Sequence, residues 1–225
     1  MRKLKIPTAD FIYFNDKNNT IKYVYEFYKH SLEDNIVIKY SGLAKGKGVY
    51  LPKNSSEAIH SINELYKNNQ ENYEGILVET KLIGTEVSVM AFCNGKEAFL
   101  MPQAQDYKRT YDNNIGPNTG GMGAICPVNI LNTNELKDVN EYMNRVVRTL
   151  DYIGVLYAGI MKTNNGIYLL EFNCRFGDPE TQVILNLLDT DLETIILNMI
   201  DGHKLNIKWK KTFAAAVVLS HKDYP

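Results

Sequence analysis

The sequence has no long hydrophobic run and almost no net charge. No stretch approaches the roughly 18 apolar residues that span a membrane, and the residues after Met1 lack the apolar core of a secretion signal. The formal charge is −1, and the lysines and arginines form no long run. The composition therefore predicts no membrane and no nucleic acid as partners, and any anion must be bound by individually placed residues. We expect a cytoplasmic protein.

Cysteine is also scarce. The three cysteines, Cys93, Cys126 and Cys174, are an odd number without metal-site spacing, which fits reduced thiols better than a disulfide framework. The sequence places no histidine beside Cys174, so we do not expect a nucleophilic cysteine. Hydrophobic residues still make up 44% of the 225 residues, enough for a real core in one large domain or two small ones.

Hydrophobic periodicity predicts both helices and strands. Helices are expected at residues 20–30, 55–68, 134–150, 179–188 and 191–202, with Asp178 and Asp191 as caps of the last two. Strands are expected at residues 5–14, 35–40, 49–51, 73–80, 86–92, 155–161, 166–173 and 213–219, the last of them buried. Periodicity stops from Met101 to Ala124, where we expect a long loop, and loops of that length are usually functional or disordered.

The stretch from Leu169 to Gln182 carries a candidate metal site. Residues two apart on a strand share a face, so Glu171 and Asn173 present a carboxylate and an amide oxygen side by side. Such hard oxygen ligands suit Mg²⁺, which takes one or two carboxylates together with waters and nucleotide phosphates. Arg175 follows two residues later, where its guanidinium could bind a phosphate or a carboxylate. The alternative is a surface strand end with a few solvated charges.

A glycine-rich segment lies between two expected strands. Gly42, Gly46 and Gly48 surround Lys45 and Lys47, and backbone amides of such a loop can wrap an anion. The spacing matches neither a Walker loop nor a Rossmann turn. A glycine hairpin with solvated lysines therefore stays open as the alternative.

Two further candidates come from the second quarter of the chain. Glu79 and Glu86 bracket a crossing between two expected strands, where backbone groups can bind an adenine edge and a carboxylate can accept from ribose hydroxyls. Two solvated glutamates at strand ends are the simpler interpretation. The expected loop that follows has four glycines between Gly116 and Gly123, mixed with polar residues, which favours a substrate loop.

The motifs of this loop and of its neighbours resemble a known family. The segment GPNTGGMGA at residues 116–124 follows PQAQDYKR and precedes LYAGIM and EFNCRFGDPETQ, and this series is similar to the phosphoribosylamine–glycine ligases of the ATP-grasp superfamily. IPTA near the start, VIKYSGLAKGKGV at residues 37–49 and HKDYP at the end fit in the same order. The resemblance implies an α+β ATP-grasp fold with two lobes and the nucleotide between them.

The resemblance also implies an activity and a set of site residues. The expected reaction joins glycine to 5-phosphoribosylamine through a glycyl phosphate, in purine biosynthesis, with ATP and Mg²⁺ or Mn²⁺. Residues expected to contact ATP are Lys39, Gly46, Lys47, Gly48, Glu79, Lys81, Leu82 and Glu86. Glu171 and Asn173 would bind the metal, and Lys39 and Arg175 would stabilise the reacting phosphate. Residues expected at the glycine and amine sites are Asp106, Lys108, Arg109, Asn118, Thr119, Gly120 and Gly121.

Some positions depart from the family pattern. Thr80 and Lys81 stand where a glutamate and an aromatic residue are usual, Thr85 replaces the first glutamate of a GEE motif, and Tyr107 replaces a histidine. The adenine hinge is therefore expected to be slightly altered.

The resemblance also divides the chain. Residues 1–22 would start the ATP-grasp core, 23–85 would form the lid, 86–202 the core with the metal and substrate loop, and 203–225 the start of a C-terminal domain. The family's N-terminal domain and one ATP-binding lysine would precede Met1, so we expect little activity from the chain alone. The alternatives are a fragment that binds ATP and Mg²⁺ without full activity, and another ATP-grasp ligase of a carboxylate and an amine.

Overall fold

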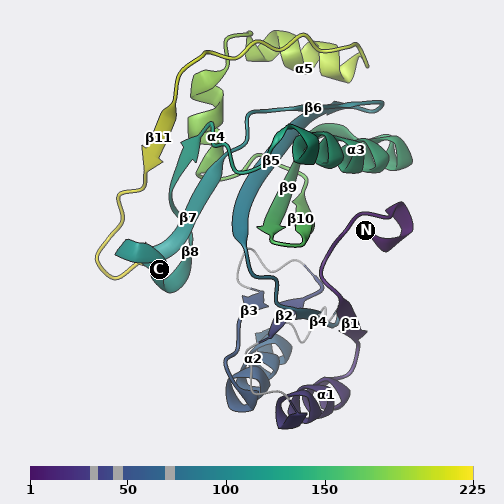
Figure 1. Ribbon diagram of the computed structural model, residues 1–225, viewed down its shortest axis with the longest axis vertical. Helices are drawn as coiled ribbons and strands as arrows, with labels where there is room; N and C mark the ends of the chain where they lie inside the picture. Colours follow the sequence, from purple (N-terminus) through teal and green to yellow (C-terminus); the bar gives the residue numbers. More distant parts are fainter. Residues whose placement is uncertain (31–34, 43–47, 69–73, 225) are drawn as a thin grey trace. The chain divides into compact units, whose positions relative to one another are not determined.

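The computed structural model describes residues 1–30, 35–42, 48–68 and 74–224. The chain divides into two compact units. The smaller unit is Ala9–Ile83, and the larger unit consists of Met1–Thr8 and Gly84–Pro225. Figure 1 labels the helices and strands of both. In the described part of the chain, no helix is both long and apolar enough to cross a membrane.

The unit Ala9–Ile83 is an antiparallel sheet covered by two helices. Its strands are ordered β1-β4-β2-β3. Their bounds are β1 Phe11–Phe14, β2 Ile36–Tyr40, β3 Val49–Tyr50 and β4 Ile76–Thr80. Helices α1, Lys17–His30, and α2, Ser55–Asn68, lie together on one face of the sheet (Figure 1). Apolar residues of both helices and of the two central strands form one buried cluster, in which Val24, Ile38 and Ile62 have no exposed surface.

The larger unit contains two antiparallel sheets. The first has the order β10-β9-β5-β6 and the second β11-β8-β7. The bounds in the first sheet are β5 Thr85–Asn94, β6 Ala98–Leu100, β9 Ile153–Thr163 and β10 Gly166–Asn173. In the second they are β7 Gln105–Tyr111, β8 Ile115–Cys126 and β11 Ala214–Val217. The helices are η1 Arg2–Leu4, η3 Asp112–Asn114, α3 Thr133–Leu150, α4 Glu180–Ile184, η4 Leu185–Leu187 and α5 Leu192–Ile200.

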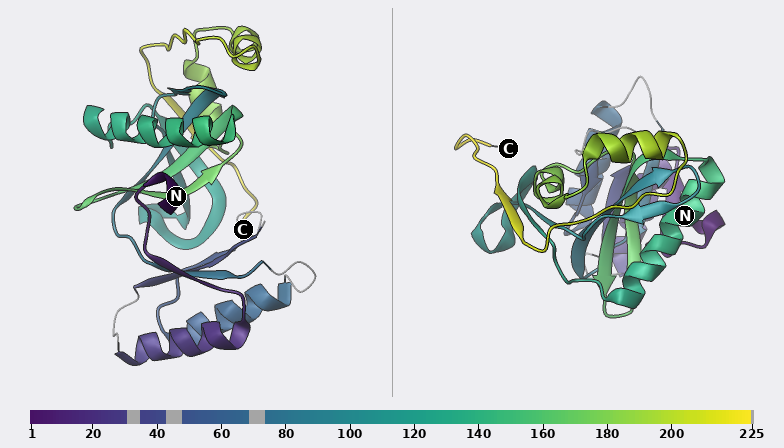
Figure 2. Two further views of the ribbon diagram at one scale, coloured as in Figure 1. Left: turned by 90° about the vertical axis from the view of Figure 1, so that its right-hand side faces the viewer. Right: turned by 90° about the horizontal axis from the view of Figure 1, so that it is seen from above.

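The period-two alternation of β5 separates two cores. Val87, Val89 and Ala91 face a buried cluster that includes α3, which lies along one face of the first sheet (Figure 2). Met90 and Phe92 point to the opposite face, where they pack with α4, α5 and the second sheet. Both faces of the first sheet are therefore buried, and this explains why β5 is a nearly continuous apolar run in the sequence.

Helix α3 begins with a reciprocal cap. The side chain of Asn132 accepts from the amides of Asn134 and Glu135 at 2.9 and 3.0 Å, and the Glu135 carboxylate accepts from the Asn132 amide at 2.7 Å. The carboxylate also pairs with Lys162 on β9 at 2.9 Å. The cap therefore satisfies amides that the helix leaves without partners and links the helix to the sheet.

Replacing Asn132 by alanine is expected to lower the free energy of unfolding by about 1 kcal/mol, the usual cost of losing an N-cap side chain. Urea denaturation followed by circular dichroism measures the change. Asn134→Ala is the matched control, because Asn134 is exposed in the same helical turn and only its backbone amide takes part in the cap. Equal losses from both variants would contradict a specific role for the cap.

The prediction of a long loop from Met101 to Ala124 was wrong. Most of it forms the hairpin of β7 and β8, whose register shifts between Tyr107 and Arg109 and again before Tyr111. Neither strand alternates cleanly between apolar and polar residues, because β7 is polar and only partly buried and β8 is rich in glycine. The polar side chains of the expected substrate loop are therefore held on a paired sheet.

Other expectations for the C-terminal part also need correction. The last strand, β11, pairs with β8 but is not buried, since Phe213, Val217 and Leu219 are 80% exposed or more. The helix expected at residues 179–188 is split into α4 and η4. Asp178 does not cap it, because its carboxylate accepts from the Gln182 side chain at 2.7 Å instead.

The structure also shifts the expected domain boundaries. A boundary between residues 22 and 23 would cut α1, and β1 belongs with the smaller unit because it pairs with β4. That unit therefore starts at Ala9. Residues 203–225 cluster with the larger unit, because β11 extends its second sheet. Their assignment to a further domain stays a prediction.

Candidate functional site

The expected metal ligands lie side by side at the end of β10. The amide nitrogen of Asn173 donates to the Glu171 carboxylate at 3.0 Å, which confirms that both side chains share one face of the strand. Gly159 stands opposite Glu171 on β9, so no side chain crowds the carboxylate from that strand. Rotating the Asn173 side-chain amide by half a turn exchanges the positions of its nitrogen and its oxygen. The groups that bind to the amide decide which of the two atoms faces Glu171.

This pair fits a hard divalent cation. Rotating the amide would place two oxygen donors together on an exposed edge, which suits Mg²⁺ when phosphate and water oxygens complete the coordination. Over the described residues, no group of three or more histidine, cysteine or acidic side chains could hold a metal ion. Arg175 is exposed just beyond the pair, and its guanidinium donates to the Phe176 carbonyl at 2.8 Å.

In the smaller unit, two expected ATP contacts form an ion pair. The Lys39 ammonium lies 2.7 Å from the Glu79 carboxylate, and the two side chains are only 17% and 13% exposed. Strands β2 and β4 pair so that Val37 faces Glu79, which places Lys39 two residues away on the same side. Removing either partner would leave the other as a largely buried group without its ion-pair partner, which is destabilising.

The other residues of the smaller unit that are expected to contact ATP differ in their hydrogen bonds and in their exposure. The amide of Lys81 donates to the Asn35 carbonyl at 2.8 Å, so this donor is already used within the unit. Leu82 is partly exposed. Gly48 is buried, and its carbonyl accepts from the Tyr40 amide at 2.9 Å. Gly46 and Lys47 lie outside the described residues.

Lys108 connects an expected ATP contact with expected substrate contacts. Its ammonium lies 2.9 Å from the Glu86 carboxylate on β5 and 3.5 Å from the Asp106 carboxylate on β7. Burial acts to lower the pKa of Lys108, but the carboxylates of Asp106, Glu86 and Glu171 outweigh it and raise that pKa. Burial raises the pKa of Asp106, and Lys108 opposes this shift. The metal pair and this cluster therefore form one acidic region in which Lys108 is a central cation.

Replacing Lys108 by methionine is expected to destabilise the chain by about 1 kcal/mol at pH 7, the upper range for a partly exposed ion pair. Because its pKa is raised in the folded state, its contribution is complete below the unfolded value of about 10.4 and is lost as the pH rises through the higher folded value. Urea denaturation at pH 7 and above pH 11 measures this dependence. Lys204→Met, an exposed lysine of the same unit, is the control. A loss that is equally large at both pH values would contradict the ion-pair explanation.

The hairpin holds the remaining expected substrate residues. Arg109 donates to the Gly116 carbonyl at 2.7 Å and faces Asn118 across the strands. The Thr119 hydroxyl donates to the Lys108 carbonyl at 2.9 Å and accepts from the Gly121 amide at 3.0 Å. These contacts shape the hairpin itself. The Asn118 side chain is exposed.

The Gly120 amide donates to the Tyr224 hydroxyl at 3.1 Å, which ties the hairpin to the end of the chain.

Two of the three cysteines are buried. All three are free, and burial raises the pKa of both Cys93 and Cys126 to about 12, so these two are unreactive thiols. Cys174 is exposed beside Asn173.

Sequence reasoning missed one buried polar group near this region. Glu180 is only 2% exposed, and its carboxylate accepts from the hydroxyls of Ser88 and Tyr157 at 2.9 and 2.5 Å. In the sequence, a glutamate in the first turn of an expected helix is ordinary. Its partners lie on strands far away in the sequence, so no local pattern could have pointed to it.

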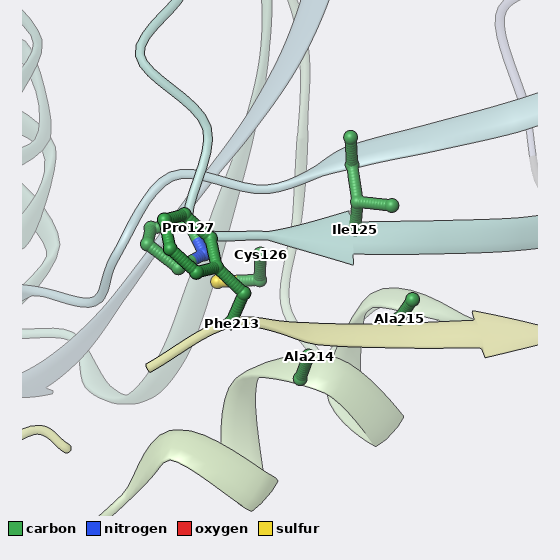
Figure 3. Close-up of a pocket in the computed structure, with 6 residues that line it drawn as sticks. All are labelled: Ile125, Cys126, Pro127, Phe213, Ala214 and Ala215. Atoms are coloured by element: carbon green, nitrogen blue, oxygen red, sulfur yellow. The ribbon is translucent and has the colours of Figure 1, made fainter. Parts of the chain in front are cut away.

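A depression on the second sheet is separate from these residues. Its lining, shown in Figure 3, is apolar and consists of Ile125, Cys126, Pro127, Phe213, Ala214 and Ala215. None of the expected site residues lines it. It offers no polar side chain to orient a ligand, so the candidate site is the polar region around β7, β8 and β10.

Comparisons with known proteins identify the family of the chain. Residues 1–181 match the family described as Phosphoribosylglycinamide synthetase, ATP-grasp (A) domain. A phosphoribosylamine–glycine ligase from Halalkalibacterium halodurans is 39% identical over 235 residues, which cover 100% of this chain and 53% of that protein. The crystal structure of a phosphoribosylamine–glycine ligase from Thermotoga maritima is similar with a TM-score of 0.86 at 34% identity, covering 100% of this chain and 58% of that chain.

A more distant structure shares the fold alone. A biotin carboxylase domain from Hydrogenobacter thermophilus, in complex with MgADP, ADP and bicarbonate, has a TM-score of 0.71 at 13% identity and covers 95% of this chain and 47% of that one. The α+β ATP-grasp fold expected from the sequence is confirmed. The chain spans about half the length, or less, of the curated relatives it matches.

Proposed function

Because the chain belongs to the phosphoribosylglycinamide synthetase ATP-grasp (A) domain family, we propose that it provides the ATP-dependent core of a ligase that joins glycine to 5-phosphoribosylamine. The products are glycinamide ribonucleotide, ADP and phosphate, in purine biosynthesis. The observation that carries the proposal is the likeness, over the whole chain, to a phosphoribosylamine–glycine ligase of known structure at 34% identity.

The proposed reaction has two steps. A carboxylate oxygen of glycine attacks the γ-phosphorus of ATP, and the bond to the bridging oxygen breaks to release ADP. The amine nitrogen of phosphoribosylamine then attacks the acyl carbon of the glycyl phosphate, phosphate leaves, and the nitrogen loses a proton. Neither step needs a nucleophilic side chain. The protein accelerates both by holding the reactants together and by neutralising charge on the phosphoryl group.

The residues of the chain divide between these tasks. Lys39 and Glu79 would bind the phosphates and the adenine amino group of ATP, and their 2.7 Å contact supports this because it brings the two side chains together at one place. Arg175, exposed beyond β10, would bind the phosphate being transferred. Asp106 and Lys108 would bind the polar groups of glycine or the amine, with Asn118 of the hairpin beside them.

Glu171 and Asn173 would hold Mg²⁺ or Mn²⁺, as their adjacent side chains allow. When bound, the cation supplies positive charge at the phosphate oxygens. The MgADP complex of a protein with the same fold supports this choice of cofactor. Lys108 offsets part of the negative charge of the Glu86 and Asp106 carboxylates. The metal ion is therefore not the sole positive charge that would compensate the carboxylates of the site.

Two measurements on the 225-residue chain test the proposal. Titration calorimetry with ATP should show binding that strengthens when Mg²⁺ is added. Slow ADP release should then depend on glycine, while D-alanine and bicarbonate serve as control carboxylates. Because little ligase activity is expected from the chain alone, freshly generated phosphoribosylamine should increase this release only slightly. Absence of ATP binding by a chain that is folded by circular dichroism would overturn the nucleotide assignment. ADP release with a control carboxylate but not with glycine would identify a different ligase of the same fold.

A further inference from the structure

The buried carboxylate of Glu180 is the centre of a closed hydrogen-bonded network. Both hydroxyls that donate to it, those of Ser88 and Tyr157, also lie 2.8 Å from each other. Burial and the neighbouring Glu180 carboxylate raise the pKa of Tyr157, so this hydroxyl keeps its proton and acts as a donor. Three elements, β5, β9 and α4, thus meet at one carboxylate oxygen in the interior of the larger unit.

The network fixes the turn that precedes α4. A Cβ built on Gly177 would lie 2.6 Å from the second carboxylate oxygen of Glu180, so the carboxylate rests directly on the backbone there. The Gly177 amide contacts the Met90 sulfur at 3.4 Å, and its carbonyl accepts from both the amide and the hydroxyl of Thr181. The turn 177–180 is therefore bonded to β5 through Met90 and to α4 through Thr181.

The same turn packs against the glycine-rich strand. A Cβ built on Gly121 would lie 2.4 Å from the Pro179 side chain and 3.3 Å from the Asp178 carbonyl oxygen. Gly121 and its neighbours are the hairpin residues assigned to substrate binding, and Arg175 lies at the other end of the turn. The turn thus stands between two parts of the candidate site.

We propose that Glu180, with Tyr157 and Ser88, is a positioning group that fixes the turn 177–180 and, through Pro179, the backbone of β8 at Gly121. All three are buried, with at most 8% of their surface exposed, so we assign none of them a contact with a reacting atom. Their role is to hold the hairpin and Arg175 in one fixed arrangement, and the link to substrate binding rests on the proposed function. Among the described residues no cationic side chain forms an ion pair with Glu180, and a buried carboxylate in that position is costly, which is why its hydroxyl donors are expected to matter.

Amide hydrogen exchange of the 225-residue chain tests the proposal directly. In Tyr157→Phe, exchange should accelerate at least tenfold both at Gly120–Gly121 and at the amides of Gly177, Asp178 and Glu180, after correction for global stability. Tyr152→Phe is the matched control, because it also removes a tyrosine hydroxyl from the same unit, one that donates to the Val155 carbonyl at 2.8 Å. Glu180→Gln keeps an acceptor oxygen and should exchange like the parent, whereas Glu180→Ala should resemble Tyr157→Phe.

The outcomes separate this inference from the proposed function. If Tyr157→Phe lowers stability but exchange at Gly120–Gly121 follows only the global change, Glu180 is merely structural and the inference is overturned. A glycine affinity that falls in Tyr157→Phe while MgATP affinity is unchanged would support positioning of the substrate segments. If the parent chain binds no MgATP, the proposed function fails, and the exchange experiment still decides whether the network positions β8.

Discussion

Replacing Glu171 by glutamine is expected to weaken Mg²⁺-dependent ATP binding by at least 10- to 100-fold, since changes to groups that only support a metal ligand already cost about that much. Glutamine keeps the size of the side chain and one acceptor oxygen but removes the charge that attracts the cation. Glu171 is exposed at the end of β10, so the loss of its carboxylate should leave the fold almost unchanged. The expected result is therefore a large change in affinity with a small change in stability.

Calorimetry with ATP in the presence and absence of Mg²⁺ measures this effect, and electron paramagnetic resonance of bound Mn²⁺ reports the metal independently of nucleotide. Glu97→Gln is the matched control, because Glu97 is an exposed glutamate of the same unit outside the acidic region. An unchanged MgATP affinity in Glu171→Gln would show that the metal is bound elsewhere. A loss without Mg²⁺ as well as with it would indicate that Glu171 contacts the nucleotide itself.

Local patterns in the sequence were sufficient for much of the secondary structure. Helix α2 and strand β10 have the expected bounds because each has strong periodicity and clear ends. The placement of Glu171 and Asn173 on one face follows from strand geometry alone, and their 3.0 Å contact confirms it.

Features that depend on sheet order could not be predicted in this way. The ion pair of Lys39 and Glu79 exists because β2 and β4 are neighbours in the sheet. The two residues are separated by 39 others in the sequence, and no local pattern predicts that their strands pair. The hairpin of β7 and β8 was missed because its register is set by contacts across the strands and by β11, while its own residues are polar or glycine. Period-two alternation is weak where neither face is fully buried.

Replacing Gly121 by alanine is expected to lower the free energy of unfolding by roughly 2 to 6 kcal/mol, because two separate costs arise at this position. Its φ of 134° lies in a region that side chains other than glycine rarely adopt, which costs on the order of 1 to 3 kcal/mol. The new methyl group would also approach the Pro179 ring to 2.4 Å, and forcing an extra carbon into a packed region costs about 1 to 3 kcal/mol more.

A second glycine separates these two costs. Gly166 has a similar φ of 130°, but a Cβ built there meets no atom within 4 Å, so Gly166→Ala should show the backbone cost alone. Urea denaturation of both variants gives the difference, which measures how firmly the Asp178–Pro179 turn is held against β8. Equal destabilisation by the two alanines would mean that the Asp178–Pro179 turn moves away from the new methyl group at little cost in free energy. A larger loss in Gly121→Ala, with faster exchange at residues 177–180, is the expected result, since a turn fixed by Glu180 cannot move away from the methyl group without breaking its own hydrogen bonds.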